Sequence, residues 1–225
     1  MKKLLMFFCA ILLVFGFLGI GTATANLITN GDFEMLDDRV GNVQGYKLNE
    51  LNTSPLQWDV YDALPGGWYS GVDDAGIEVQ YDGVVVPAHS PSHYIELDSH
   101  PGPNSNSSMS QDIMFSEGFY SLSFWYRPRT ETEGDNGIDV YFDIDLIYQV
   151  DGVASDFPDW QLFTTAGYVD EGLHTITFSA VGLENTLGGF IDTVAINPVP
   201  EPATMLLLGS GLIGLAAFRR KLRKR

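Results

Sequence analysis

The sequence has 225 residues, of which 29 are acidic and 12 are basic, and its formal net charge at pH 7 is −17. All 29 acidic residues but only four of the basic residues lie within 26–202, so this segment carries a formal charge of −25. Such a surface repels nucleic acid, whose binding depends on neutralised phosphates. The single cysteine, Cys9, lies near the N-terminus, so the segment has no disulfide, thiol nucleophile or thiolate metal site.

The N-terminus has the pattern of a secretory signal peptide over residues 1–25. Met1-Lys2-Lys3 gives a positive start, an apolar run follows over 4–20, and Ala23-Thr24-Ala25 matches a cleavage site of small residues. We therefore expect an N-terminal signal helix, followed by an exported domain that begins at Asn26.

Short segments of alternating apolar and polar residues, separated by Gly, Pro, Asn and Asp, make up the middle of the chain. We expect strands at 76–81, 121–126, 139–146, 175–180 and 189–196, and loops at 100–110 and 130–137. Many short strands with regular turn signals predict an all-β sandwich. A segment of this length can bury a shared core between two sheets.

The order of short motifs in this segment resembles the galactose-binding-like jelly rolls of carbohydrate-binding modules. The resemblance starts at Asn26-Leu27-Ile28-Thr29-Asn30-Gly31-Asp32-Phe33-Glu34 and ends at Gly189-Phe190-Ile191-Asp192-Thr193-Val194. It implies a jelly-roll β-sandwich over 26–197. Fold alone does not give function, because that family includes binders, enzyme accessory domains and proteins of unknown role.

The same resemblance implies a structural Ca²⁺ site at Glu34 and Asp192. In that family the opening Phe-Glu segment and the Asp of the last strand often lie side by side and hold the ion. Asp32 is a candidate additional ligand, since it would share a strand face with Glu34, and backbone carbonyls would complete six to eight oxygens. The alternative is that these carboxylates are surface or capping groups.

Aromatic side chains are the candidates for sugar binding, because sugar C–H faces stack on aromatic rings while carboxylates and amides bond the hydroxyls. We expect ligand contacts from Trp58, Tyr61, Trp68 and Trp125. Trp125 alternates with apolar neighbours in its strand and is expected to face outward. The alternative, strongest for Trp68, is burial in the core, where aromatic residues dominate sandwich packing.

Enzymatic motifs are absent from the sequence. It has no Gly-x-Ser-x-Gly, His-Glu-x-x-His or phosphate-loop motif. His89 and His93 are four residues apart, but nearby prolines break any helix, so we expect exposed loop histidines and no metal site. Asp143 and Asp145 share a face of a predicted strand, and such a pair is expected by chance among 29 acidic residues. We therefore expect no catalysis.

The C-terminal tail, 198–225, contains a Pro-Glu-Pro motif, an uncharged apolar run and a basic end. Pro202 fixes φ, so a helix can begin only after it. The run 203–218 is about one turn shorter than the ~20 residues that span a bilayer core, and the basic residues after it can snorkel to make up the difference. We expect a single transmembrane helix at 203–218 with the basic end on the cytoplasmic side.

This tail resembles the PEP-CTERM sorting signal of Gram-negative, exopolysaccharide-producing bacteria, also described as an ice-binding protein C-terminal domain. The matching parts are Val199-Pro200-Glu201-Pro202, the Gly209-Ser210-Gly211-Leu212 centre, and the terminal basic cluster. The resemblance implies recognition by an exosortase, a membrane transpeptidase that removes the tail. Pro200, Glu201 and Pro202 would then form a substrate motif.

These interpretations together predict an exported protein that is anchored in the inner membrane before processing. Afterwards it would lie at the cell surface or in the extracellular matrix and bind polysaccharide without catalysis. The alternative is a structural or adhesive biofilm matrix protein that has no small ligand and is stabilised by Ca²⁺.

Overall fold

The computed structural model describes residues 26–71, 75–100 and 105–199, together with positions 209–212, 215 and 219 of the tail. The expected signal peptide at 1–25, the Pro200-Glu201-Pro202 motif and most of the expected transmembrane run lie outside the described residues. Within the described part of the chain, no helix is long and apolar enough to cross a membrane.

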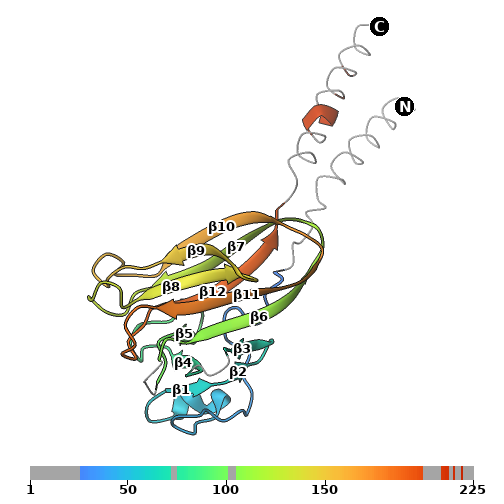
Figure 1. Ribbon diagram of the computed structural model, residues 1–225. Coiled ribbons are helices and arrows are strands. Elements are labelled where there is room, and N and C mark those ends of the chain that lie inside the picture. Colours follow the sequence, from blue (N-terminus) through green and yellow to red (C-terminus); the bar gives the residue numbers. More distant parts are fainter. Residues whose placement is uncertain are drawn as a thin grey trace.

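Twelve strands and one short 3₁₀ helix, η1 (Leu48–Thr53), make up the described part of the domain (Figure 1). The strands are β1 (Trp58–Tyr61), β2 (Ala63–Leu64), β3 (Trp68–Ser70), β4 (Ile77–Tyr81), β5 (His93–Glu96), β6 (Ser108–Phe115), β7 (Gly118–Arg127), β8 (Gly137–Phe142), β9 (Asp145–Val150), β10 (Gln161–Val169), β11 (Gly172–Val181) and β12 (Phe190–Pro198).

The strands form two antiparallel six-stranded sheets. The first sheet has the order β1-β4-β5-β12-β7-β10, and the second has the order β2-β3-β6-β11-β8-β9. The two sheets pack face to face as a sandwich (Figure 1). The all-β jelly-roll sandwich predicted from the sequence is therefore confirmed.

Alternation along the strands builds the core between the sheets. In β7, Leu122 and Phe124 are buried and face inward, and they meet Ile176 and Phe178 of β11 in one apolar cluster. Each such side chain contributes about 1.5–3 kcal/mol on full burial. The polar residues between them point to the outer faces of the sandwich.

One predicted strand is wrong. Residues 139–146 do not form a single strand but the end of β8, a tight turn and the start of β9. Asp143 lies in the turn with φ of +53°, a conformation that Asp tolerates better than most residues. Asp143 and Asp145 therefore do not share a strand face. The loop expected at 100–110 also ends early, because β6 begins at Ser108.

The segment between β4 and β5, residues 82–92, folds over part of the outer face of the first sheet. There Val86 packs with Tyr94, Trp160 and Phe190 in a second, smaller apolar cluster that is separate from the main core. Next to this cluster, the same outer face carries two buried carboxylates, Glu78 of β4 and Glu96 of β5.

Candidate functional site

Buried charged side chains gather on the outer face of the first sheet, at β4 and β5. In β4, Ile77 and Val79 face the core, so Glu78 points to the opposite side. Glu96 of β5 lies directly opposite Glu78 in the strand register. Both carboxylates are fully buried, with exposed fractions of 1% and 0%. Two like charges in this position repel each other, so the pair needs a positive partner.

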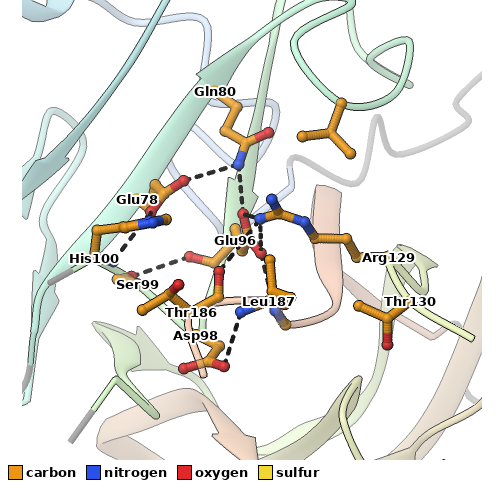
Figure 2. A network of polar contacts seen from close by, with 12 residues as sticks. Glu78, Gln80, Glu96, Asp98, Ser99, His100, Arg129, Thr130, Thr186 and Leu187 are labelled. Carbon is orange, nitrogen blue, oxygen red and sulfur yellow. Dashed lines mark hydrogen bonds and ion pairs between the residues drawn. The ribbon is translucent and has the colours of Figure 1, made fainter. Parts of the chain in front are cut away.

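Arg129, in the loop that follows β7, supplies that positive charge. Its Nη1 lies 2.5 and 2.6 Å from the two carboxylate oxygens of Glu96 (Figure 2). Gln80 donates from Nε2 to Glu78 at 2.8 Å and to Glu96 at 2.5 Å, and the backbone N–H of Gly188 donates to Glu96 at 2.9 Å. Both Glu96 oxygens are thus occupied by hydrogen-bond donors.

The ionisation of this pair depends on the balance between burial and charge. Burial, and after it the Glu78 carboxylate, raise the pKa of Glu96 well above its ordinary value, while Arg129 opposes the shift. Burial also lowers the pKa of Arg129, but the neighbouring Glu96 more than compensates and the pKa is raised. Glu96 therefore relies on Arg129 for its charged form.

Trp58 and His100 form an accessible rim beside this network. Trp58 of β1 lies opposite Gln80 in the register, and its ring centroid is 4.8 Å from that of His100, with 35° between the ring planes. Nδ1 of His100 lies 3.1 Å from Glu78 Oε2, and this hydrogen bond is the main reason that the pKa of His100 is raised. Trp58 is half-buried, and the His100 side chain is 36% exposed.

Arg129 completes this rim. Of its three guanidinium nitrogens, only Nη1 makes hydrogen bonds to the described residues, and the side chain is 19% exposed. The remaining N–H groups of the guanidinium can therefore donate to a ligand. We call the surface formed by Trp58, His100 and Arg129 the aromatic–guanidinium rim.

Two of the four residues predicted to bind a ligand lie in the core instead. Tyr61 and Trp68 are each 1% exposed and pack between the sheets. The Trp68 indole donates to the backbone oxygen of Asn30 at 3.1 Å. A side chain enclosed in this way cannot stack on a sugar, so the expectation of ligand contact is corrected for both residues.

Trp125 faces outward as predicted, but one face of its ring is covered. His89 stacks on it with the ring centroids 3.9 Å apart and 20° between the planes. Nδ1 of His89 also lies 2.9 Å from Thr193 Oγ1, which holds the imidazole in place. Of the four predicted ligand residues, only Trp58 adjoins the charged network.

The two predicted calcium ligands are brought to one segment of chain, residues 89–93. Glu34 Oε1 accepts backbone hydrogen bonds from this segment at 2.6 and 2.8 Å, and Asp192 Oδ2 accepts two more at 2.7 and 2.9 Å. Burial raises the pKa of Asp192 to about 6. For Glu34, burial is outweighed by hydrogen bonds from His93 and Ser92, which lower its pKa.

His93 is also part of this arrangement and corrects the expectation of an exposed loop histidine. It is the first residue of β5, is 3% exposed, and has its Nδ1 3.0 Å from Glu34 Oε2.

The remaining candidate ligand, Asp32, is exposed, and its Oδ1 lies 3.5 Å from the backbone nitrogen of Glu34. Among the described residues, no group of three His, Cys, Asp or Glu side chains is placed to hold a metal ion. The carboxylate oxygens of Glu34 and Asp192 face N–H donors, whereas Ca²⁺ takes six to eight oxygen ligands. The calcium site stays a prediction.

Sequence reasoning missed Glu78, Glu96, Arg129 and His100 as site residues. A usable signal was present, because only four basic residues lie within 26–202 and Arg129 is one of them. Alternation in 76–81 also placed Glu78 on the face opposite the core. The pairing of β4 with β5, which brings Glu78 against Glu96, is a long-range contact that the local pattern does not contain.

The comparisons with known proteins address the tail and the domain separately. The family described as the PEP-CTERM protein-sorting motif matches residues 198–221, which confirms the resemblance of the tail. No curated protein matches the chain.

Solved structures resemble the domain. TmCBM61 in complex with β-1,4-galactotriose is 18% identical, with a TM-score of 0.50, and the match covers 78% of this chain and 100% of that chain. A structure described under "CBM4 structure and function" is 18% identical, with a TM-score of 0.41 and coverage of 76% and 99%. The K1 cleaved adhesin domain of Lys-gingipain from Porphyromonas gingivalis W83 is 13% identical, with a TM-score of 0.47 and coverage of 63% and 97%.

At these identities the likeness to TmCBM61 establishes the fold and nothing further. The described domain is a jelly-roll β-sandwich like that of carbohydrate-binding modules, and the chain carries a PEP-CTERM protein-sorting motif at residues 198–221.

Proposed function

We propose that this is an exported protein whose jelly-roll domain binds polysaccharide, without catalysis, at the aromatic–guanidinium rim. The observation that carries the proposal is the half-buried Trp58 beside His100 and the partly exposed Arg129. A sugar needs an aromatic surface for its C–H face and fixed donors for its hydroxyls, and the rim supplies both. The rigid β4–β5 pair beneath it holds these groups in place.

The charge of the domain favours neutral polysaccharides over acidic ones. With a formal charge of −25 over 26–202, an anionic polymer would be repelled before it reached the rim. Arg129 is already paired with the Glu96 carboxylate, so its positive charge does not offset the negative potential of the domain.

The network also supports a binding role more than a catalytic one. A general acid or base must present a free oxygen to its substrate. Glu96 accepts hydrogen bonds on both oxygens, and Glu78 accepts from Gln80 and His100. Both carboxylates serve to position the rim.

The tail supports export and surface processing. In this proposal the run 203–218 holds the precursor in the inner membrane and an exosortase recognises Pro200, Glu201 and Pro202. The domain is then delivered to the cell surface or extracellular matrix. The match of residues 198–221 to the sorting motif supports these steps.

Affinity electrophoresis against a panel of neutral and acidic polysaccharides tests the binding proposal. Trp58→Ala should weaken binding to the retained glycan by about 2 kcal/mol, or about 30-fold, if the ring is a central contact. Tyr69→Ala is the matched control, since this aromatic ring is 39% exposed in β3 of the other sheet.

Equal losses in Trp58→Ala and Tyr69→Ala, or none in Trp58→Ala, would contradict the assignment of the rim. A folded wild-type protein that retains no glycan would instead favour the structural or adhesive matrix role.

A further inference from the structure

Three two-residue connections between strands, which we call turns, lie together at one end of the sandwich. They connect β6 to β7, β8 to β9 and β10 to β11, and the register places Phe115 opposite Gly172, Gly118 opposite Val169 and Phe142 opposite Ile176. The chain leaves the domain at the same end, because β12 ends there (Figure 1) and the backbone N–H of Val199 donates to Phe119 at 2.7 Å. We call this the tail-side end.

The tail-side end displays large apolar side chains to solvent. Ile144, Met114 and Leu173, with exposed fractions of 91%, 67% and 62%, are the three most exposed large hydrophobic residues in the described part of the chain, and all three lie at or next to these turns. Phe119 and Tyr168 lie at the same end, are also exposed, and contact each other with ring centroids 5.2 Å apart. Exposed apolar groups that gather in this way mark an interaction surface.

The interior next to this end is apolar as well. An opening of about 380 Å³ lies between the sheets, lined by Phe115, Tyr120, Phe142, Ile147 and Val169 among others. Tyr168 belongs both to this lining and to the exposed surface.

The position of the tail identifies what covers this surface. Val199 is the last described residue of the domain, and the uncharged run begins at residue 203. Four extended residues span at most about 14 Å. If the run lies in a bilayer, the tail-side end is held at the membrane surface whatever the conformation of the linker.

We propose that the tail-side end of the domain docks on the lipid surface while the precursor is anchored, with Ile144, Met114 and Leu173 in contact with the interface. This inference rests on the membrane insertion of 203–218 in the proposed function. The apolar turns gain by partial burial in the interface, and the tether removes most of the entropy loss of association.

The charges at the same turns determine which lipids are preferred. Glu117, Asp143, Asp145, Asp170 and Glu171 lie in or beside the turns. An anionic headgroup layer repels these carboxylates, so the surface fits a zwitterionic bilayer.

Depth-dependent fluorescence quenching tests the docking in the full chain. A Cys9→Ser background receives a single cysteine by Ile144→Cys or, as control, by Leu183→Cys, and each is labelled with an environment-sensitive dye. Leu183 is 52% exposed and follows the opposite end of β11. In phosphatidylcholine vesicles with a headgroup-proximal quencher lipid, we expect a blue shift and quenching at 144 but neither at 183. Phosphatidylglycerol should reduce the quenching at 144.

Resistance of the protein to alkaline carbonate extraction reports membrane insertion of 203–218, so it distinguishes failure of the anchoring from failure of the docking. An inserted protein without quenching at 144 overturns the docking alone, and loss of insertion overturns the anchoring on which it rests. A blue shift at 144 without quenching means that a second copy covers the surface, which also overturns lipid docking. Quenching that increases with phosphatidylglycerol contradicts the assigned lipid preference.

Discussion

Arg129→Met tests whether the buried carboxylates on the outer face depend on one guanidinium. The substitution keeps most of the side-chain volume but leaves Glu96 fully buried beside Glu78 without its positive partner. Removing one member of a buried ion pair costs about 3–5 kcal/mol. For a domain of this size, each kcal/mol lowers the melting temperature by about 2–4 °C, so we expect a fall of about 6–20 °C.

The loss of stability in Arg129→Met should also depend on pH in a defined direction. Without Arg129, the pKa of Glu96 in the folded state rises further above its ordinary value of 4.5. A carboxyl whose pKa is higher when folded destabilises the protein above that pKa, and the penalty disappears as the pH falls toward 4.5. The stability gap between Arg129→Met and the wild type should therefore narrow on acidification.

Urea unfolding of a double-mutant cycle provides the assay. Glu96→Gln in the Arg129→Met background removes the stranded charge and keeps a similar shape, so it should recover most of the lost free energy of unfolding. A loss below about 1 kcal/mol in Arg129→Met, or a double variant no more stable than Arg129→Met, would refute the ion-pair argument.

Three further predictions concern other parts of the domain. A Ca²⁺ ion between Glu34 and Asp192 would link the first segment to the last strand, so excess chelator should lower the melting temperature and added Ca²⁺ should restore it. An unchanged melting curve would mean that the N–H groups of residues 89–93 stabilise these carboxylates without a metal ion. The raised pKa of His100 implies stabilisation that is full below pH 6.5 and lost as the pH rises through the raised pKa. His100→Gln should accordingly differ from the wild type in melting temperature at acidic but not alkaline pH. A Cβ on Gly31 would lie 2.0 Å from the backbone oxygen of Val194, so Gly31→Ala should lower the free energy of unfolding by about 3 kcal/mol in urea unfolding. Gly45 has open space around it but a φ of +75°, so Gly45→Ala should lower that free energy by only about 1 kcal/mol. Equal losses in the two variants would contradict the close approach at Gly31.

The fold was largely predictable because the strands that build the core alternate strictly. The segments expected at 121–126 and 175–180 are the centres of β7 and β11, the two strands that carry much of the core. The failure at 139–146 has a local cause, since Asp143 in a tight turn leaves the alternation uninterrupted on both sides. Period-two patterns detect the strands but not a turn of two residues between them.

The candidate site was harder to predict because its parts come from distant segments. Trp58 was identified from its residue type. Glu96 and Arg129 can be recognised as site residues only once the fold brings β5 and the loop after β7 together. Residue type also could not separate Trp58 from Trp68, because both follow loop-like sequence. Burial distinguishes them, and burial is set by the whole sandwich.

The position of β12 has a consequence for the order in which the domain is made. β12 is the last strand in the chain, but it lies between β5 and β7 inside the first sheet. If the chain is exported from its N-terminus, as proposed above, the two halves of that sheet cannot join until residues 190–198 have crossed the membrane. Such long-range pairing also folds slowly. Because the sorting motif begins at residue 198, the first sheet can close only when the sorting motif itself reaches the membrane. In the proposed export route, closure of the first sheet and exposure of the processing site would therefore occur at the same stage of translocation.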